Sequence, residues 1–266
     1  MVFVSVKRLF ESDKIEESEA IAKELLKENK NNVFALKALA RVSASQNNTQ
    51  LALKLYERAI SLAASDATAH CELGWIYHQQ GDFANAEAHL TKARDLDPQN
   101  DLVHNRLGTL YWEQGGEYQT NKAYAYSHFL QSAKLDPKLS SNYAHIGHYL
   151  LTVEKDIDRA QKCYQKAVIL NPLEQLAGEN LASIYEAKNE EELAVALFQE
   201  VVEKNSRAFW AWKRLGLYYL AHGENEQALK SFQFALRTNS SDALSWEGLA
   251  ETYHKQGKYS AALKSY

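Results

Sequence analysis

FWAWKRLGLYYLAHGENEQALKSFQFALRTNSSD, residues 209–242, is one copy of a pattern that recurs along most of the chain. Its eighth residue is glycine, its eleventh tyrosine, its twentieth alanine and its twenty-fourth phenylalanine. Segments in the same register span residues 33–66, 67–100, 101–139, 140–174, 175–208, 209–242 and 243–266. Most are 34 residues long, and the last is truncated. A fixed period of this length indicates a repeat protein.

The residue types at the shared positions predict two closely packed helices in each copy. Glycine or alanine at the eighth and twentieth positions lets two helices approach, and aromatic residues nearby fill the space beside them. The eighth position holds Ala40, Gly74, Gly108, Gly147, Ala182, Gly216 and Ala250. The twentieth holds Ala52, Ala86, Ala125, Ala160, Ala194, Ala228 and Ala262.

Glycine and proline mark where these helices end. Glycine at the fifteenth position suits a left-handed residue after the first helix, and proline at the thirty-second closes the second. These residues are Gly81, Gly115, Gly223 and Gly257, and Pro98, Pro137 and Pro172. One helix pair cannot bury its own apolar face, so neighbouring pairs must stack. We therefore expect an all-α solenoid of about eight units in a single domain. Its array covers residues 33–266, and residues 1–32 form a degenerate first repeat.

This spacing resembles the tetratricopeptide repeat family, whose signature places Leu, Gly, Tyr, Ala, Phe, Ala and Pro at set intervals. The resemblance implies a right-handed superhelix whose first helices line a protein-binding groove. The candidate groove residues are then Phe34, Trp75, Leu102, Trp112, Leu151, Leu176, Trp210, Leu217 and Leu244. An apolar groove suits an extended peptide or a helix of another protein. The alternative is that some of these side chains pack against the next repeat.

Residues outside the signature positions narrow the resemblance. The stretches WAWKRLGLYYL at 210–220 and SWEGLAETY at 245–253 are similar to the family of scaffold subunits of Ski (superkiller) complexes. That resemblance is best over residues 101–266. It implies a non-catalytic scaffold that holds a DExH-box RNA helicase and a WD-repeat propeller subunit, and that serves the exosome indirectly in 3′–5′ mRNA decay. It also implies a cytoplasmic location, with the nucleus as a second one.

Two further expectations concern the extent of the chain and its role. Scaffold subunits of this kind are much longer, so we expect this chain to be a segment of a longer solenoid. The alternative role is that of a generic adaptor in another assembly, such as a ubiquitin ligase, a trafficking complex or a chaperone-linked one.

Composition argues against several other classes of protein. With 30 basic and 34 acidic residues the net charge is -4, which is unlike a nucleic-acid-binding tail. Arg106, Lys213 and Arg214 are basic residues on predicted first helices, but acidic residues share those faces, so direct nucleic-acid binding is not expected. No uncharged apolar stretch approaches the roughly 18 residues of a membrane span, so no membrane association is expected either.

The sequence offers little catalytic chemistry. It contains no phosphate-binding loop, GxSxG or HExxH motif. His145 and His148 lie three residues apart and could share a metal, but no third ligand is evident nearby. We therefore expect no enzyme activity, metal or cofactor.

One copy carries an irregularity of unknown purpose. The copy at 101–139 has five extra residues within EYQTNKAYAY, residues 117–126. They indicate either a longer helix pair or an edge that contacts a partner.

Overall fold

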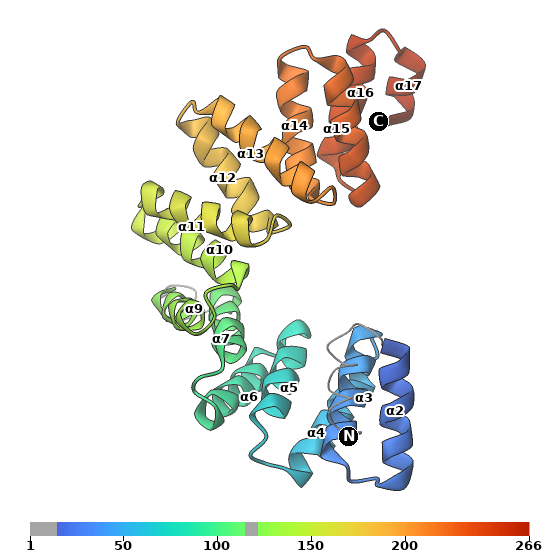
Figure 1. The fold of residues 1–266 in the computed structure, drawn as a ribbon, viewed down its shortest axis with the longest axis vertical. Helices are drawn as coiled ribbons and strands as arrows, with labels where there is room; N and C mark the ends of the chain where they lie inside the picture. The colour runs from blue at the N-terminus through green and yellow to red at the C-terminus, as the bar shows by residue number, and fades with distance from the viewer. Residues whose placement is uncertain (1–14, 115–121, 266) are drawn as a thin grey trace. The chain divides into compact units, whose positions relative to one another are not determined.

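The computed structural model describes residues 15–114 and 122–265. In these ranges helices are joined by turns, and there is no strand (Figure 1). This confirms the all-α prediction. The starts of the seven predicted repeats coincide with the first residues of seven helices. These are α3 (Val33–Ser45), α5 (Ala67–Gln79), α7 (Asp101–Glu113), α10 (Ser140–Tyr149), α12 (Gln175–Ala187), α14 (Phe209–Ala221) and α16 (Ala243–Lys255). The second helices are α4 (Thr49–Leu62), α6 (Phe83–Leu96), α9 (Ala123–Leu135), α11 (Ile157–Leu170), α13 (Glu191–Lys204), α15 (Asn225–Thr238) and α17 (Tyr259–Ser265).

Ahead of these pairs, the predicted degenerate repeat contributes one described helix, α2 (Ile15–Glu28). Ser18 and Ala22 of this helix are buried, and the first half of the repeat lies outside the described residues.

The helices gather into two compact units, Met1–Leu135 and Asp136–Tyr266, where the sequence predicted a single domain. In a repeat protein each helix pair contacts mainly its sequence neighbours, so a division can fall between any two pairs. Here it falls just before α10, close to the predicted repeat boundary at residue 140.

Polar side chains start many of these helices. An Asn or Asp oxygen accepts a hydrogen bond from the backbone N–H three residues later, which typically stabilises a helix by about 1 kcal/mol. The caps of first helices are Asn32, Asp66, Asn100 and Asp242, and those of second helices are Asn48, Asp82 and Asp156. Because these residues recur near the sixteenth and thirty-fourth positions, the caps fix both turns of the repeat.

Left-handed residues end the first helices. Gly81, Gly223 and Gly257 have φ values of 77°, 74° and 72°, which confirms their predicted role, while Gly115 lies outside the described residues. Asn47, Lys155 and Asn189 adopt the same conformation in other copies, although they carry a Cβ. The geometry is therefore a property of the position, and glycine is its least costly occupant.

The longer copies absorb their extra residues in different ways. The copy at 140–174 has one residue more than 34, and its first helix ends in a π-helical turn, η1 (Leu150–Glu154), which accommodates it. In the copy at 101–139, α7 has 13 residues, as most other first helices do, and α9 has 13, one fewer than α4, α6, α11, α13 and α15. The alternative of a longer helix pair therefore does not hold for the described helices. Most of the insertion lies outside them.

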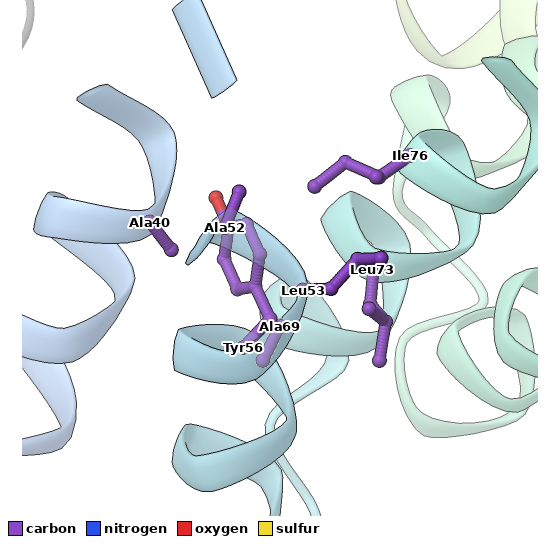
Figure 2. Close-up of a cluster of buried hydrophobic side chains, with 7 residues drawn as sticks. All are labelled: Ala40, Ala52, Leu53, Tyr56, Ala69, Leu73 and Ile76. Carbon is purple, nitrogen blue, oxygen red and sulfur yellow. The ribbon is translucent and has the colours of Figure 1, made fainter. Parts of the chain in front are cut away.

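In four of the pairs, a glycine at the eighth position faces a large side chain at the twenty-fourth. A Cβ added at Gly108 would lie 2.7 Å from Phe129, and one added at Gly216 would lie 2.7 Å from Phe232. All seven alanines at the twentieth position are buried. Figure 2 shows the corresponding cluster in the first unit, formed by Ala40, Ala52, Leu53, Tyr56, Ala69, Leu73 and Ile76 of α3, α4 and α5.

A ring nitrogen at the fourth position ties several first helices to the turn before them. The indole Nε1 of Trp212 donates to the Ser206 carbonyl at 3.0 Å, and that of Trp246 donates to the Ser240 carbonyl at 2.8 Å. In each case the acceptor lies six residues earlier.

The copy at 175–208 has Gly178 at that fourth position and so lacks a ring of its own. Trp210 of the next copy fills the space instead, and a Cβ at Gly178 would overlap its indole. Its Nε1 donates to the Pro172 carbonyl, again six residues before position 178, at 2.8 Å. Trp210 is 1% exposed, so its prediction as a groove residue is wrong. Trp210 supplies the buried ring that is missing at Gly178.

We expect Trp210→Ala to lower the free energy of unfolding by about 3–5 kcal/mol, because a buried indole is lost and a cavity remains. Adding Gly178→Trp should restore at least about half of this loss, since the new indole can occupy the same space. Urea unfolding followed by circular dichroism measures both changes. Trp246→Ala, at a partly exposed ring, serves as the control and should cost less. A double variant less stable than Trp210→Ala alone would contradict the exchange.

Candidate protein-binding surface

In the first unit, four predicted groove residues lie on first helices. Phe34 lies on α3, Trp75 on α5, and Leu102 and Trp112 on α7. Leu102 is 38% exposed, and the other three are partly exposed. Because α3, α5 and α7 begin successive repeats, these side chains come from neighbouring pairs. Their role in binding stays a prediction.

Cations flank both indoles of this group. The Arg106 guanidinium lies 5.3 Å from the centre of the Trp75 ring, and the Lys122 ammonium lies 3.9 Å from that of Trp112. Trp75 also stacks on His78, with ring centres 4.7 Å apart. These contacts hold the rings in place while leaving them partly accessible, which suits aromatic anchors at a protein interface.

In the second unit, four of the five predicted residues remain accessible. Leu151 lies on η1, Leu176 on α12, Leu217 on α14 and Leu244 on α16. Leu244 is 43% exposed, whereas Leu217 packs partly against the core cluster of α14, α15 and α16. Some of these side chains therefore reach solvent, and others support the neighbouring repeat, while their role in binding stays a prediction.

Charged side chains on the first helices are paired between repeats. Arg106 donates to Glu72 at 3.0 Å, and Lys213 donates to Glu179 at 3.1 Å. Each pair joins residues 34 apart, which occupy the same position in consecutive copies. Arg214 likewise donates to Glu186, at 2.8 Å. These three cations share helix faces with acidic residues, as expected from the sequence, and form specific ion pairs with them.

Arg106 and Asp66 each have further partners in the first unit. Arg106 also donates to the Cys71 sulfur at 3.1 Å, and burial raises the pKa of that thiol, so Cys71 is a neutral acceptor. At the start of α5, burial raises the pKa of Asp66, but hydrogen bonds from Lys37 and Thr68 outweigh it and hold that pKa below its usual range. The first-helix surface therefore offers apolar anchors among neutralised charges.

The histidines singled out as metal candidates have protein contacts. His145 Nδ1 lies 2.8 Å from the Ser141 carbonyl oxygen, one turn earlier on α10. In the described ranges, no group of three or more His, Cys, Asp or Glu side chains could hold a metal ion. Among the described helices, none has both the length and the apolar character to cross a membrane.

A hollow beside Trp246 was not predicted from the sequence. Leu236 of α15, together with Trp246 and Leu249 of α16, lines a hollow of about 360 Å³ whose rim includes Gln233 and Arg237. Trp246 is 37% exposed there. The sequence feature that could have indicated this hollow is the tryptophan at the fourth position of the last two copies, Trp212 and Trp246.

Comparison with known proteins agrees with this architecture. A family model for the tetratricopeptide repeat matches residues 5–67, 37–101, 71–120, 147–209 and 213–266. The chain belongs to the tetratricopeptide repeat family. Membership of this family supports a role in protein–protein interaction.

Several curated relatives carry the superkiller name. The chain is 32% identical to mouse superkiller complex protein 3 over 162 residues, which is 60% of this chain and 10% of that protein. It is also 32% identical to the human protein of the same name over 181 residues, 67% of this chain and 11% of that one. The chain thus spans about a tenth of the length of these relatives.

Solved structures share the fold at low sequence identity. The Cut9–Hcn1 hetero-tetramer of the APC/C superposes with a TM-score of 0.70 at 15% identity, covering 93% of this chain and 48% of that one. Pseudomonas aeruginosa pilF superposes with a TM-score of 0.62 at 20% identity, covering 82% and 97%. These similarities show the repeat fold.

We expect Glu72→Gln to lower the free energy of unfolding by about 1.5–3 kcal/mol, because the buried Arg106 guanidinium loses its carboxylate. Replacing both residues with methionine should restore much of the loss, since no buried charge remains. Denaturant unfolding tests both variants. Glu200→Gln, in an exposed pair with Lys204, is the control and should change stability by no more than about 0.5 kcal/mol. Equal losses at residues 72 and 200 would contradict the account.

Proposed function

We propose that this chain is a non-catalytic scaffold segment of a Ski-type complex. The observation that carries the proposal is the 32% identity to superkiller complex protein 3, which extends over 60–67% of this chain. Identity at that level over several consecutive repeats exceeds what the shared repeat signature alone requires. The neutral, apolar first-helix surface supports the proposal, because it favours protein partners over a phosphate backbone.

The proposed partners are the DExH-box RNA helicase and the WD-repeat propeller subunit, with the exosome served indirectly in cytoplasmic 3′–5′ mRNA decay. Stacked repeats hold neighbouring first helices in fixed order within each unit, so each unit can present a continuous binding surface. Holding two partners on one chain raises their effective concentration for each other. A generic adaptor of another assembly is the second candidate, since the APC/C structure shows this fold in a different complex.

Affinity purification of the tagged chain from a matching cell extract, followed by binding to the purified partners, tests this proposal. Leu102→Asp and Leu244→Asp place a charge on the first-helix surface of each unit at exposed positions, so the fold should survive. We expect the double variant to lose at least about tenfold in helicase or propeller affinity. Ile169→Asp, at a 74% exposed position on the second helix α11, should bind normally.

The alternatives give different results. Recovery of an unrelated assembly in place of the helicase and the WD-repeat protein would favour the generic adaptor. Unchanged binding by the Leu102→Asp, Leu244→Asp variant would move the contact away from the first helices. Circular dichroism of each variant confirms that lost binding is not lost folding.

A further inference from the structure

One side chain of the copy at 209–242 completes the core of the copy before it. The indole of Trp210, on α14, fills the space beside Gly178 of α12 and meets Phe198 of α13 edge-on, with ring centres 5.8 Å apart and ring planes at 88°. Its Nε1 donates to the Pro172 carbonyl, in the turn before α12, at 2.8 Å. Both rings are buried. A single indole of α14 therefore contacts both helices of the preceding pair and the turn that leads into them.

The copy at 175–208 has few direct ties between its own two helices. Gly178 is the one glycine at the fourth position of the seven copies. At the eighth position this copy has Ala182, so no large side chain meets a bare backbone there. Among the described residues, no hydrogen bond, ion pair or ring contact joins a side chain of α12 to one of α13. The pair is therefore held by apolar packing, and Trp210 supplies the ring at its centre.

Polar side chains of α12 and α13 bind to α14. Lys213 and Arg214 of α14 donate to carboxylates of α12, at 3.1 and 2.8 Å. Gln199 of α13 donates to the Tyr219 hydroxyl of α14 at 3.1 Å. Partly exposed contacts of this kind each contribute little to stability, whereas a buried aromatic ring contributes much. The Trp210 indole is therefore the main link from α14 to both helices of the preceding pair.

The helices around this link also lack the side-chain caps that start many other helices. Among the described helices, α12, α13, α14 and α15 form a run in which no side chain of the N-cap residue accepts a hydrogen bond from the first turn. Those N-cap residues are Glu174, Glu190, Ala208 and Glu224. In the same unit, by contrast, Asp242 caps α16. Because a cap stabilises the helix that it begins, α12 and α13 depend more than the capped helices on contacts with their neighbours.

Moving α14 away would take the indole with it and leave a large cavity between α12 and α13, which is costly in a buried core. The ring at the fourth position of the next copy works differently, because Trp212 stacks on Phe234 of its own copy, with ring centres 4.6 Å apart. We infer that Trp210 is an interlock across a repeat boundary, so that α12 and α13 stay closed only while α14 is in place.

The interlock bears on the candidate binding surface of the second unit. In a solenoid, a repeat usually meets its neighbour through an interface between two cores, whereas here the core of one repeat includes a side chain of the next. Leu176 lies on α12 and Leu217 on α14, and both are partly exposed. Because Trp210 keeps these two helices together, a disturbance of α14 reaches α12 through the core.

Hydrogen exchange of the whole chain, corrected for intrinsic rates, tests the interlock, because repeat proteins open locally and each helix can be followed separately. We expect Trp210→Ala to lower the protection of the slowest α12 and α13 amides by at least about a hundredfold, the size that the loss of a buried indole predicts. Protection in α16, two helices beyond α14, should fall by less than about tenfold. Equal losses in α12, α13 and α16 would overturn the interlock.

Phe234→Ala asks whether a disturbance of α14 is passed on. It removes the ring that stacks on Trp212 and so weakens the contact between α14 and α15, at a position that is 37% exposed. We expect protection in α14 to fall by at least about threefold, and protection in α12 and α13 to fall by the same factor, although Phe234 lies on α15. Protection in α11, ahead of this pair, should change by less than about twofold. Loosening of α14 with unchanged protection in α12 and α13 would contradict the inference.

The same substitution in an exchanged background is the matched control. In a chain with Gly178→Trp and Trp210→Ala the ring belongs to α12 itself, so the pair no longer needs α14 to complete its core. Phe234→Ala should then loosen α14 as before but change protection in α12 and α13 by less than about twofold. Equal transmission in both backgrounds would overturn the interlock. If the exchanged chain folds poorly, the effect of Phe234→Ala on α12 and α13 of the otherwise unsubstituted chain decides the question.

Discussion

The contact between a small residue at the eighth position and a large side chain at the twenty-fourth underlies the rest of the structure. Cβ atoms added at Gly74, Gly108, Gly147 and Gly216 would lie 2.7–2.9 Å from the facing Leu, Phe or Tyr side chain. Such distances leave no room for even a methyl group. The two helices of these four pairs are therefore set by the fit of one large side chain against a bare backbone, whereas alanine stands at the eighth position in the other three pairs.

Regular pairs place the same position of successive copies side by side. This explains why Arg106 meets Glu72 and Lys213 meets Glu179, each 34 residues away. It also explains why the contact between His70 and His89 recurs between His104 and His128 in the next copy. On the first helices, Arg106, Lys213 and Arg214 are paired with carboxylates, and apolar side chains such as Leu102 and Leu244 are exposed. These features fit a role in protein–protein interaction.

Much of this architecture is encoded in local patterns. The repeat starts, the buried alanines and the left-handed glycines follow from spacing alone, because each depends on contacts within one pair. Trp210 could not be placed in that way. Its position in the repeat usually faces outwards, but Gly178, 32 residues earlier, leaves a space that Trp210 fills. Only the combination of two copies reveals this exchange.

Other features were visible in the sequence but need the structure to interpret. Counting positions in the repeat places Glu72 beside Arg106. The structure adds that Arg106 is buried, which is why the ion pair matters for stability. The extra residue near Leu151 is countable, but its accommodation as a π turn depends on the fixed ends of the helix. The insertion before Ala123 lies largely outside the described residues, so the proposal that it contacts a partner stays a prediction.

The most direct test of the central contact is the stability of Gly216→Leu alone and combined with Phe232→Ala, measured by denaturant unfolding. The account predicts that Gly216→Leu lowers the free energy of unfolding by about 1–3 kcal/mol or more, because the new side chain meets the Phe232 ring. It also predicts that the combined variant loses less free energy of unfolding than the sum of the two single losses. Unchanged stability of Gly216→Leu, or strictly additive losses, would contradict it.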